Sequence, residues 1–306
     1  MKSIIIDGYE AQDIREQVEK ILRGLGNPEP PLDLAIVRDL LDLDRKFYSS
    51  DDQSAVSEIV SRVKVAGKQI VKRPAILFDV IRKAKLSALW IPDKKRILID
   101  KTKPKLKHRW SEAHEIGHSM IPWHQGLMLG DNEFSLNPRC HAQMEAEANY
   151  AAVQLLFLQD RFIAEALDVS TCLDSIKKLK GRFGNTYSST LWRYVEEIGG
   201  NKPMVGLLSE HPHRPSVNFL PNKPCRHCIQ SAGFQQQFSN ISEIDLFGVI
   251  TQYCGRQSGG PLGESEVVLN ADDGAEHIFH FESFYNRYDV LTLGRQLHRR
   301  RVAVKV

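Results

Sequence analysis

The sequence has little cysteine, little net charge and no long hydrophobic run, and each shortage excludes a class of protein. Its five cysteines are an odd number spread thinly over 306 residues, which indicates thiols in a reducing compartment and not a disulfide framework. The formal net charge of +3 is too small to indicate a nucleic-acid or membrane partner by itself. The apolar run Ile4–Ile6 is broken at once by Asp7, and no later stretch approaches a membrane span. We therefore expect a cytoplasmic globular protein with neither a signal peptide nor a membrane partner.

The first two hundred residues are mainly helical in pattern. Apolar side chains follow a helical spacing in five segments: 9–25, 33–43, 51–72, 103–120 and 141–158. Residues 87–90 and 96–99 resemble two strands joined by the polar turn 92–95. Between 170 and 198 the sequence predicts two short helices around a turn at Phe183-Gly184-Asn185.

After Gly200 the character changes to short apolar runs divided by Pro, Gly, Asn and Asp, including the runs at 247–251, 266–269 and 277–281. The whole chain is therefore predicted to be α+β. We expect a mainly helical domain with a small sheet over residues 1–160, a helical subdomain over 161–200, and a β-rich C-terminal domain over 201–306. The last domain is interpreted as sensory or substrate-positioning.

The most informative segment is His114-Glu115-Ile116-Gly117-His118. Two histidines four residues apart project from one face of a helix, so both can bind the same metal ion. Zinc favours neutral imidazole nitrogens, and a glutamate next to the first histidine can take the proton of a water molecule and pass it to the leaving amine. The simpler alternative is an exposed helix that happens to carry two histidines.

Two imidazoles need at least one further protein ligand, and the helix about thirty residues downstream offers two carboxylates. Glu145 and Asn149 share a face, so Glu145 could bind the metal while Asn149 orients a metal-bound histidine. Glu147 lies about 200° from Glu145 on the helical wheel, so both cannot reach the ion equally. We favour Glu145 and keep Glu147 as the alternative ligand. The predicted cofactor is one Zn²⁺ per chain, with Mn²⁺ also compatible with the ligand set.

With these residues in place, the chain resembles the ImmA/IrrE metallopeptidases. The resemblance rests on Ser111–His118 and on the segment Glu145–Leu156, whose Glu-Ala-Glu-Ala-Asn start matches the family's downstream helix. Residues 30–34 and the strand Arg96–Ile99 also resemble family segments, so that about residues 10–200 are covered. The sequence departs from the family in having Ala151 where a phenylalanine is usual, and in lacking a proline after Leu156.

The resemblance implies a zincin-like domain that cleaves a protein substrate, with helix-turn-helix transcriptional repressors of stress-response or mobile-element genes as the substrate class. It assigns His114, His118 and Glu145 as metal ligands and Glu115 as general base. Tyr150 and His124 are candidates for stabilising the oxyanion. We also expect a strand at the sheet edge, formed by Arg96, Ile97, Leu98 and Ile99, to pair with an extended substrate.

Two other features allow alternative interpretations. Residues 176–193 have the outline of a helix-turn-helix, in which Thr190 and Arg193 would face DNA, although a packed helical subdomain is the simpler interpretation. The segment Cys225-Arg-His-Cys228 could bind a second metal, but a single pair of this kind is more often free thiols in a loop. The alternative function is a non-proteolytic regulator that binds DNA or protein and uses its metal only for structure.

Overall fold

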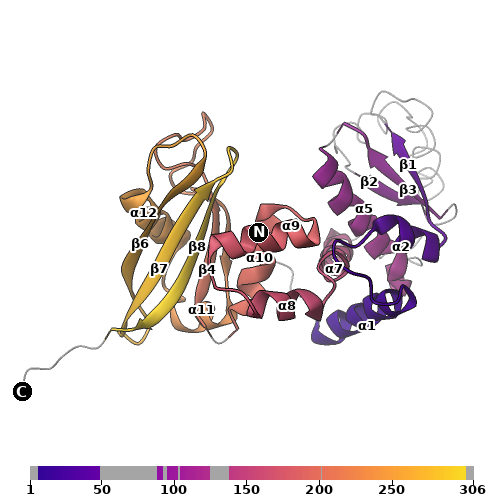
Figure 1. The fold of residues 1–306 in the computed structure, drawn as a ribbon, viewed down its shortest axis with the longest axis horizontal. Coiled ribbons are helices and arrows are strands. Elements are labelled where there is room, and N and C mark those ends of the chain that lie inside the picture. The colour runs from indigo at the N-terminus through magenta and orange to yellow at the C-terminus, as the bar shows by residue number, and fades with distance from the viewer. Residues whose placement is uncertain are drawn as a thin grey trace, which may run out of the picture. The chain divides into compact units, whose positions relative to one another are not determined.

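The computed structural model describes residues 6–48, 88–91, 95–102, 104–124, 138–200 and 202–300. The helix expected at 51–72 and most of the loop expected after Trp123 lie outside these residues. The chain divides into two compact units, Met1–Gln159 and Asp160–Val306, which are labelled by element in Figure 1. Among the helices within the described ranges, none combines the length and the apolar character needed to cross a bilayer.

The first unit contains a small mixed sheet. Its strands are β1 (Asp44–Tyr48), β2 (Ala88–Ile91) and β3 (Arg96–Asp100), in the order β1-β3-β2. Strand β3 runs parallel to β1 and antiparallel to β2. The expectation that residues 96–99 form an edge strand for the substrate is therefore wrong, because the backbone of β3 is paired on both sides within the sheet.

The described part of the first unit also contains helices that pack against this sheet and against one another. They are α1 (Gly8–Gly24), α2 (Leu34–Leu40), α5 (Lys105–Met120) and α7 (Pro138–Leu156). Asp7 and Asp33 begin α1 and α2, and each carboxylate accepts a backbone N–H two residues on, at 2.9 and 2.8 Å. Helix α5 packs against β2 and β3 on one side and against α7 on the other, while α1 packs against α7. The active-site motif predicted from the sequence therefore lies on a central helix.

Two local features fix the position of α5. Pro122 disfavours helical backbone at the preceding residue, so Ile121 is extended and the helix ends at Met120. Gly117 lies at a close approach of α5 to α7: a Cβ built there would be 2.8 Å from the carbonyl oxygen of Ala148 and 3.2 Å from the Cβ of Ala151. The small residue at 151, where the family usually has phenylalanine, thus lies within this close contact.

The second unit is built on a five-stranded antiparallel sheet, which confirms the β-rich character of the C-terminal region. Its strands are β4 (Met204–Ser209), β5 (Cys225–Gln230), β6 (Gly260–Asn270), β7 (Glu276–Tyr285) and β8 (Val290–Arg299), in the order β5-β4-β8-β7-β6. The helices of this unit are α8 (Asp160–Leu167), α9 (Leu173–Phe183), α10 (Tyr187–Ile198), α11 (Ala232–Gln237) and α12 (Glu243–Tyr253). Helices α9 and α10 pack against the sheet, so the helical segment expected as a separate subdomain lies in the same unit as the strands.

The apolar run at 247–251, expected among β-type runs, belongs instead to helix α12. Ser242 and Asp245 form a reciprocal capping box at its start, in which Ser242 accepts the backbone N–H of Asp245 and Asp245 accepts that of Ser242. Leu246 and Ile250 then face a core that includes Phe279 of β7. The runs at 266–269 and 277–281 lie in β6 and β7 as expected.

Helices α9 and α10 are joined at Gly184, whose left-handed backbone (φ 66°) ends α9. The two residues that a DNA-binding interpretation requires are both buried. The Thr190 hydroxyl donates to the carbonyl oxygen of Thr186 at 2.8 Å, and Arg193 forms an ion pair with Glu197 of its own helix. Neither side chain can therefore contact DNA in this arrangement.

Cys225 and Cys228 lie in strand β5, not in a loop. A register shift between β4 and β5 next to Cys225 breaks the strict alternation of side chains, and both cysteines contact the core of the unit. Burial is the main cause that raises the pKa of each thiol to about 12. Both groups are therefore protonated thiols near neutral pH, the less reactive form of cysteine.

Candidate metal centre

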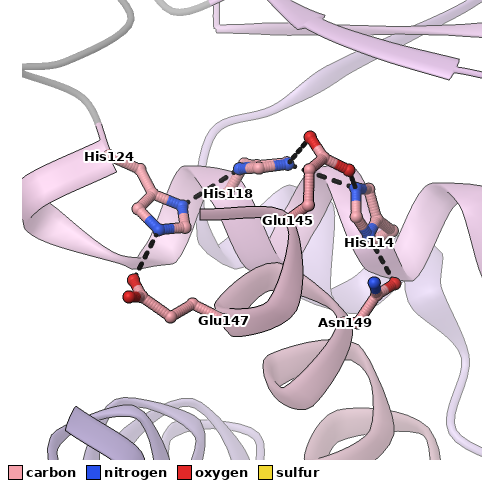
Figure 2. A network of polar contacts seen from close by, with 6 residues as sticks. All are labelled: His114, His118, His124, Glu145, Glu147 and Asn149. Carbon is pink, nitrogen blue, oxygen red and sulfur yellow. Dashed lines mark hydrogen bonds and ion pairs between the residues drawn. The ribbon is translucent and has the colours of Figure 1, made fainter. Parts of the chain in front are cut away.

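Three side chains from two helices converge in the first unit. His114 and His118 come from α5, and Glu145 comes from α7 (Figure 2). The Nε2 atoms of the two histidines are 3.1 Å apart, and the Glu145 carboxylate oxygens lie 3.3 Å from His114 Nε2 and 3.5 Å from His118 Nε2. The structure thus brings together the three residues that the sequence proposes as ligands.

The donor atoms of this group fit a metal ion. One ligand atom from each of the three residues lies within 4.8 Å of the other two. Two imidazole nitrogens and one carboxylate oxygen are a donor set that zinc accepts in catalytic sites. Among the described residues this is the one group of three such side chains that is close enough to hold an ion.

The electrostatics of the three groups reflect their proximity. The hydrogen bonds from His114 and His118 hold the pKa of Glu145 far below its ordinary value. Burial lowers the pKa of His118, whereas for His114 the effect of burial is outweighed by its hydrogen bond to Glu145 and by the charge of Glu115, so that its pKa is raised. The carboxylate of Glu145 is therefore ionised and available as a ligand.

Glu115 lies on the same helix and is almost completely buried. Burial raises its pKa to about 7, although the charge of His114 and a hydrogen bond from the Trp90 backbone N–H act in the opposite direction. A carboxyl group with a pKa near neutrality can both accept and release a proton at physiological pH. The Trp90 backbone also places strand β2 directly beside this carboxylate.

Each histidine has a hydrogen-bond partner at its other ring nitrogen. His114 Nδ1 is 3.0 Å from Asn149 Oδ1, the contact that the sequence predicts for a residue orienting a ligand (Figure 2). His118 Nδ1 is 3.0 Å from His124 Nδ1, and His124 Nε2 is 2.8 Å from Glu147 Oε2.

This arrangement changes the roles expected for two residues. His124 is fully buried and both of its ring nitrogens have partners, so it is not available to stabilise an oxyanion. Glu147 faces His124 and Trp123, and not the cluster of His114, His118 and Glu145. Tyr150, the other oxyanion candidate, is half-buried and does not belong to the network drawn in Figure 2.

Sequence reasoning missed a partly buried ion triad that holds α5 against other elements of its unit. Glu112 of α5 is almost fully buried, and its carboxylate accepts from Arg38 Nε at 2.6 Å and from Arg45 Nη1 at 2.8 Å. These arginines belong to α2 and β1, so the triad fixes α5 to two other elements. The signal available in the sequence was Glu112 itself, a charged residue on the buried side of the motif helix.

Tyr48, at the end of β1, is a second residue that sequence reasoning missed. Its ring is buried, and burial is the main cause that raises the pKa of its hydroxyl to about 12, with smaller effects from the charges of Asp100 and Glu115. The hydroxyl therefore stays protonated near Glu115.

Comparison with known proteins agrees with this geometry. Residues 76–193 match the Peptidase M78 family, described as the IrrE N-terminal-like domain. This part of the chain is therefore similar to the IrrE N-terminal-like domain, as the resemblance to the ImmA/IrrE metallopeptidases predicts. This family supports a metallopeptidase-type function and implies a metal cofactor.

Among solved structures, the chain is similar to a Mycobacterium tuberculosis transcriptional regulator, with 13% sequence identity and a TM-score of 0.47. The similarity covers 94% of this chain and 88% of that one. No curated protein matches the chain.

Proposed function

We propose that this protein is a zinc-dependent endopeptidase that hydrolyses a peptide bond in another protein. The observation that carries the proposal is the convergence of His114, His118 and Glu145 beside the buried carboxylate of Glu115. A purely structural metal site has no need of a base, so the position of Glu115 favours catalysis over the alternative of a non-proteolytic regulator.

In this proposal His114, His118 and Glu145 hold the metal, and Asn149 orients His114. A zinc ion bound there would activate a water molecule and polarise the scissile carbonyl group. Glu115 accepts the proton of that water and delivers it to the leaving amine, which its raised pKa favours. The hydrogen bond from the Trp90 backbone orients the Glu115 carboxylate for both steps.

The substrate strand is reassigned from β3 to β2. Strand β2 is the outer strand of the described sheet on the side next to Glu115, since the Trp90 N–H donates to that carboxylate. An extended substrate that adds to this edge would lie beside the metal ligands of α5, which pack against β2. The substrate class that the family resemblance suggests is a helix-turn-helix transcriptional repressor, cleaved in the cytoplasm as part of a stress response.

Metal content tests this function first. The purified chain should bind about one zinc per molecule, and His114→Ala and Glu145→Ala should both lose it, because each variant removes one of three protein donors. If Glu145→Ala retained its zinc, a residue other than Glu145 would be the third ligand. A wild-type chain that takes up no zinc, together with partner or DNA binding that is unchanged in Glu115→Gln, would favour the regulator.

A further inference from the structure

The sheet of the second unit has a long edge strand. In the order β5-β4-β8-β7-β6, strand β6 pairs with β7 on one side only, and Figure 1 draws it as the outermost strand of this sheet, next to β7. Alternate residues of an antiparallel edge strand turn their backbone N–H and C=O groups away from the sheet. The edge of β6 can therefore accept a further strand wherever these groups are not already bonded.

The two halves of β6 differ in how this edge is protected. In the first half, Pro261 has no N–H, and the register with β7 shifts between Pro261 and Gly263. The N–H of Gly255 also donates to the carbonyl oxygen of Leu262 at 2.6 Å. In the second half, none of the described residues outside β6 and β7 donates to or accepts from a backbone group of residues 264–270. Within the described part of the chain, the second half is therefore the open part of the edge.

This open half carries apolar side chains on both faces of the sheet. Val267 and Leu269 face the core of the unit, and Val268 points to the opposite face with 41% of its surface exposed. Opposite Val268 on β7 lies Ile278, which is also only partly buried. One more strand beside β6 would cover apolar surface on both faces at once.

The sequence of the open half is complementary to itself when two copies run antiparallel. In a pairing of residues 266–270 centred on Val268, this valine faces its own copy, and Val267 faces Leu269 of the second copy. Glu266 then faces Asn270 of the second copy, whose side-chain amide can donate to the carboxylate. A register centred on Glu266 would instead place two carboxylates directly opposite each other, which is unfavourable. The charges therefore favour the register centred on Val268 over that one.

We propose that β6 pairs with β6 of a second copy of this chain through residues 266–270, which joins the two five-stranded sheets into one continuous antiparallel sheet. Such a pairing is two-fold symmetric, so both copies use the same surface and the assembly closes as a dimer. The inference is independent of the metal centre and of the proposed function, since all of its residues lie in the second unit.

The mass of the full chain in solution tests the pairing. Sedimentation velocity over a wide range of concentration should show a monomer of 34.8 kDa in equilibrium with a dimer of twice that mass. Val268→Lys places two lysines opposite each other at the two-fold axis and should raise the dissociation constant by about tenfold or more. The matched control is Ile244→Lys, which introduces the same charge on α12 at a side chain that is 49% exposed, and it should leave the dissociation constant unchanged.

Crosslinking tests the register. With a short thiol-specific crosslinker, Val268→Cys should form a covalent dimer, because residue 268 lies opposite its own copy. Glu266→Cys should form far less, because the two copies of residue 266 are offset by about 13 Å along the strands. Wild-type protein treated in the same way measures the background from its five cysteines.

Three results would overturn the inference. A wild type that stays monomeric at every concentration shows that the edge does not bind a second copy and leaves it to an extended segment of another protein. A dimer that Val268→Lys and Ile244→Lys weaken equally, or that neither weakens, is formed by another surface. Equal crosslinking at residues 266 and 268, or none at 268 in a dimeric protein, contradicts the symmetric register. This last readout decides the matter even if Val268→Lys does not fold, because Val268→Cys changes the side chain little.

Discussion

The helix pairs α5–α7 and α9–α10 both bury polar side chains, but they provide partners for them in different ways. On α5 and α7 the partners come from other elements: Glu145 reaches His114 and His118 across the pair, and Glu112 reaches α2 and β1. On α10, Thr190 bonds to the start of its own helix and Arg193 pairs with Glu197 one turn away. Polar residues at helical spacing thus indicate a functional site when another element supplies their partners. When their own helix supplies the partners, the same spacing indicates only that the polar groups are hydrogen-bonded within the packed helix.

The largest expected effect is on the proposed peptidase activity and comes from a substitution in the helix pair α5–α7. Glu115→Gln should lower peptidase activity on a cleaved protein substrate by roughly 10²–10⁴-fold, because it removes the group that moves the proton. Zinc content should stay at the wild-type level, since Glu115 is not among the three converging donors. Wild-type cleavage rates in a zinc-loaded Glu115→Gln protein would mean that another group is the base.

The next effect concerns the triad that fixes α5. Glu112→Ala should lower the free energy of unfolding by about 3 kcal/mol, the lower end for a buried pair, because Arg38 loses a buried partner while the more exposed Arg45 stays in contact with water. Denaturant unfolding measures this change. The control is Glu19→Ala, which breaks an exposed pair with Arg23 on α1 and should cost only about 0.3–0.5 kcal/mol. Equal losses in the two variants would show that the triad has no special role.

Two helical glycines are expected to respond in opposite ways to replacement by alanine, one lowering and the other raising the free energy of unfolding. Gly117→Ala should destabilise the protein by about 1–3 kcal/mol, because its Cβ would meet the backbone of α7. Gly181→Ala in α9 has open space around the new Cβ and should stabilise by about 0.5–1 kcal/mol. Thermal unfolding of both variants measures the difference, and a stabilising Gly117→Ala would contradict the close approach of α5 and α7.

The smallest effect, on the free energy of unfolding, is expected for a substitution in the helix pair α9–α10. Thr190→Val removes one hydroxyl, while the carbonyl oxygen of Thr186 keeps the backbone N–H of residue 190 as a donor. The free energy of unfolding should therefore fall by no more than about 1 kcal/mol. DNA binding, measured by fluorescence anisotropy, should be the same in both proteins. A specific loss of DNA affinity in this variant would restore the helix-turn-helix interpretation.

Much of the candidate site could be predicted because it depends on local spacing. His114 and His118 are four positions apart in the sequence, and Glu145 and Glu147 point in different directions on the helical wheel, so both relations follow from the sequence alone. The position of β3 between two neighbours could not be predicted, because strand order depends on pairing between distant segments. Strand β1 was missed for another reason: four of its five residues are exposed and show no apolar alternation.

The role of His124 illustrates the same limit within the site. The sequence offered it as a candidate for stabilising the oxyanion, but its ring contacts Glu147, which is 23 residues away on another helix. Glu112 likewise depends on arginines 74 and 67 residues distant. Such partners are identified only when the fold brings them together.

The close approach at Gly117 also has a consequence for the three converging donors. Since α5 carries two of the converging donors and α7 carries the third, the distance between the helix axes sets the width of the triangle that they form. A residue larger than glycine at 117 would push the helices apart and widen that triangle. We therefore expect a larger residue at 117 to move the two histidines of α5 away from Glu145, so that the convergence of the three donors depends on the same glycine as the packing of the helices.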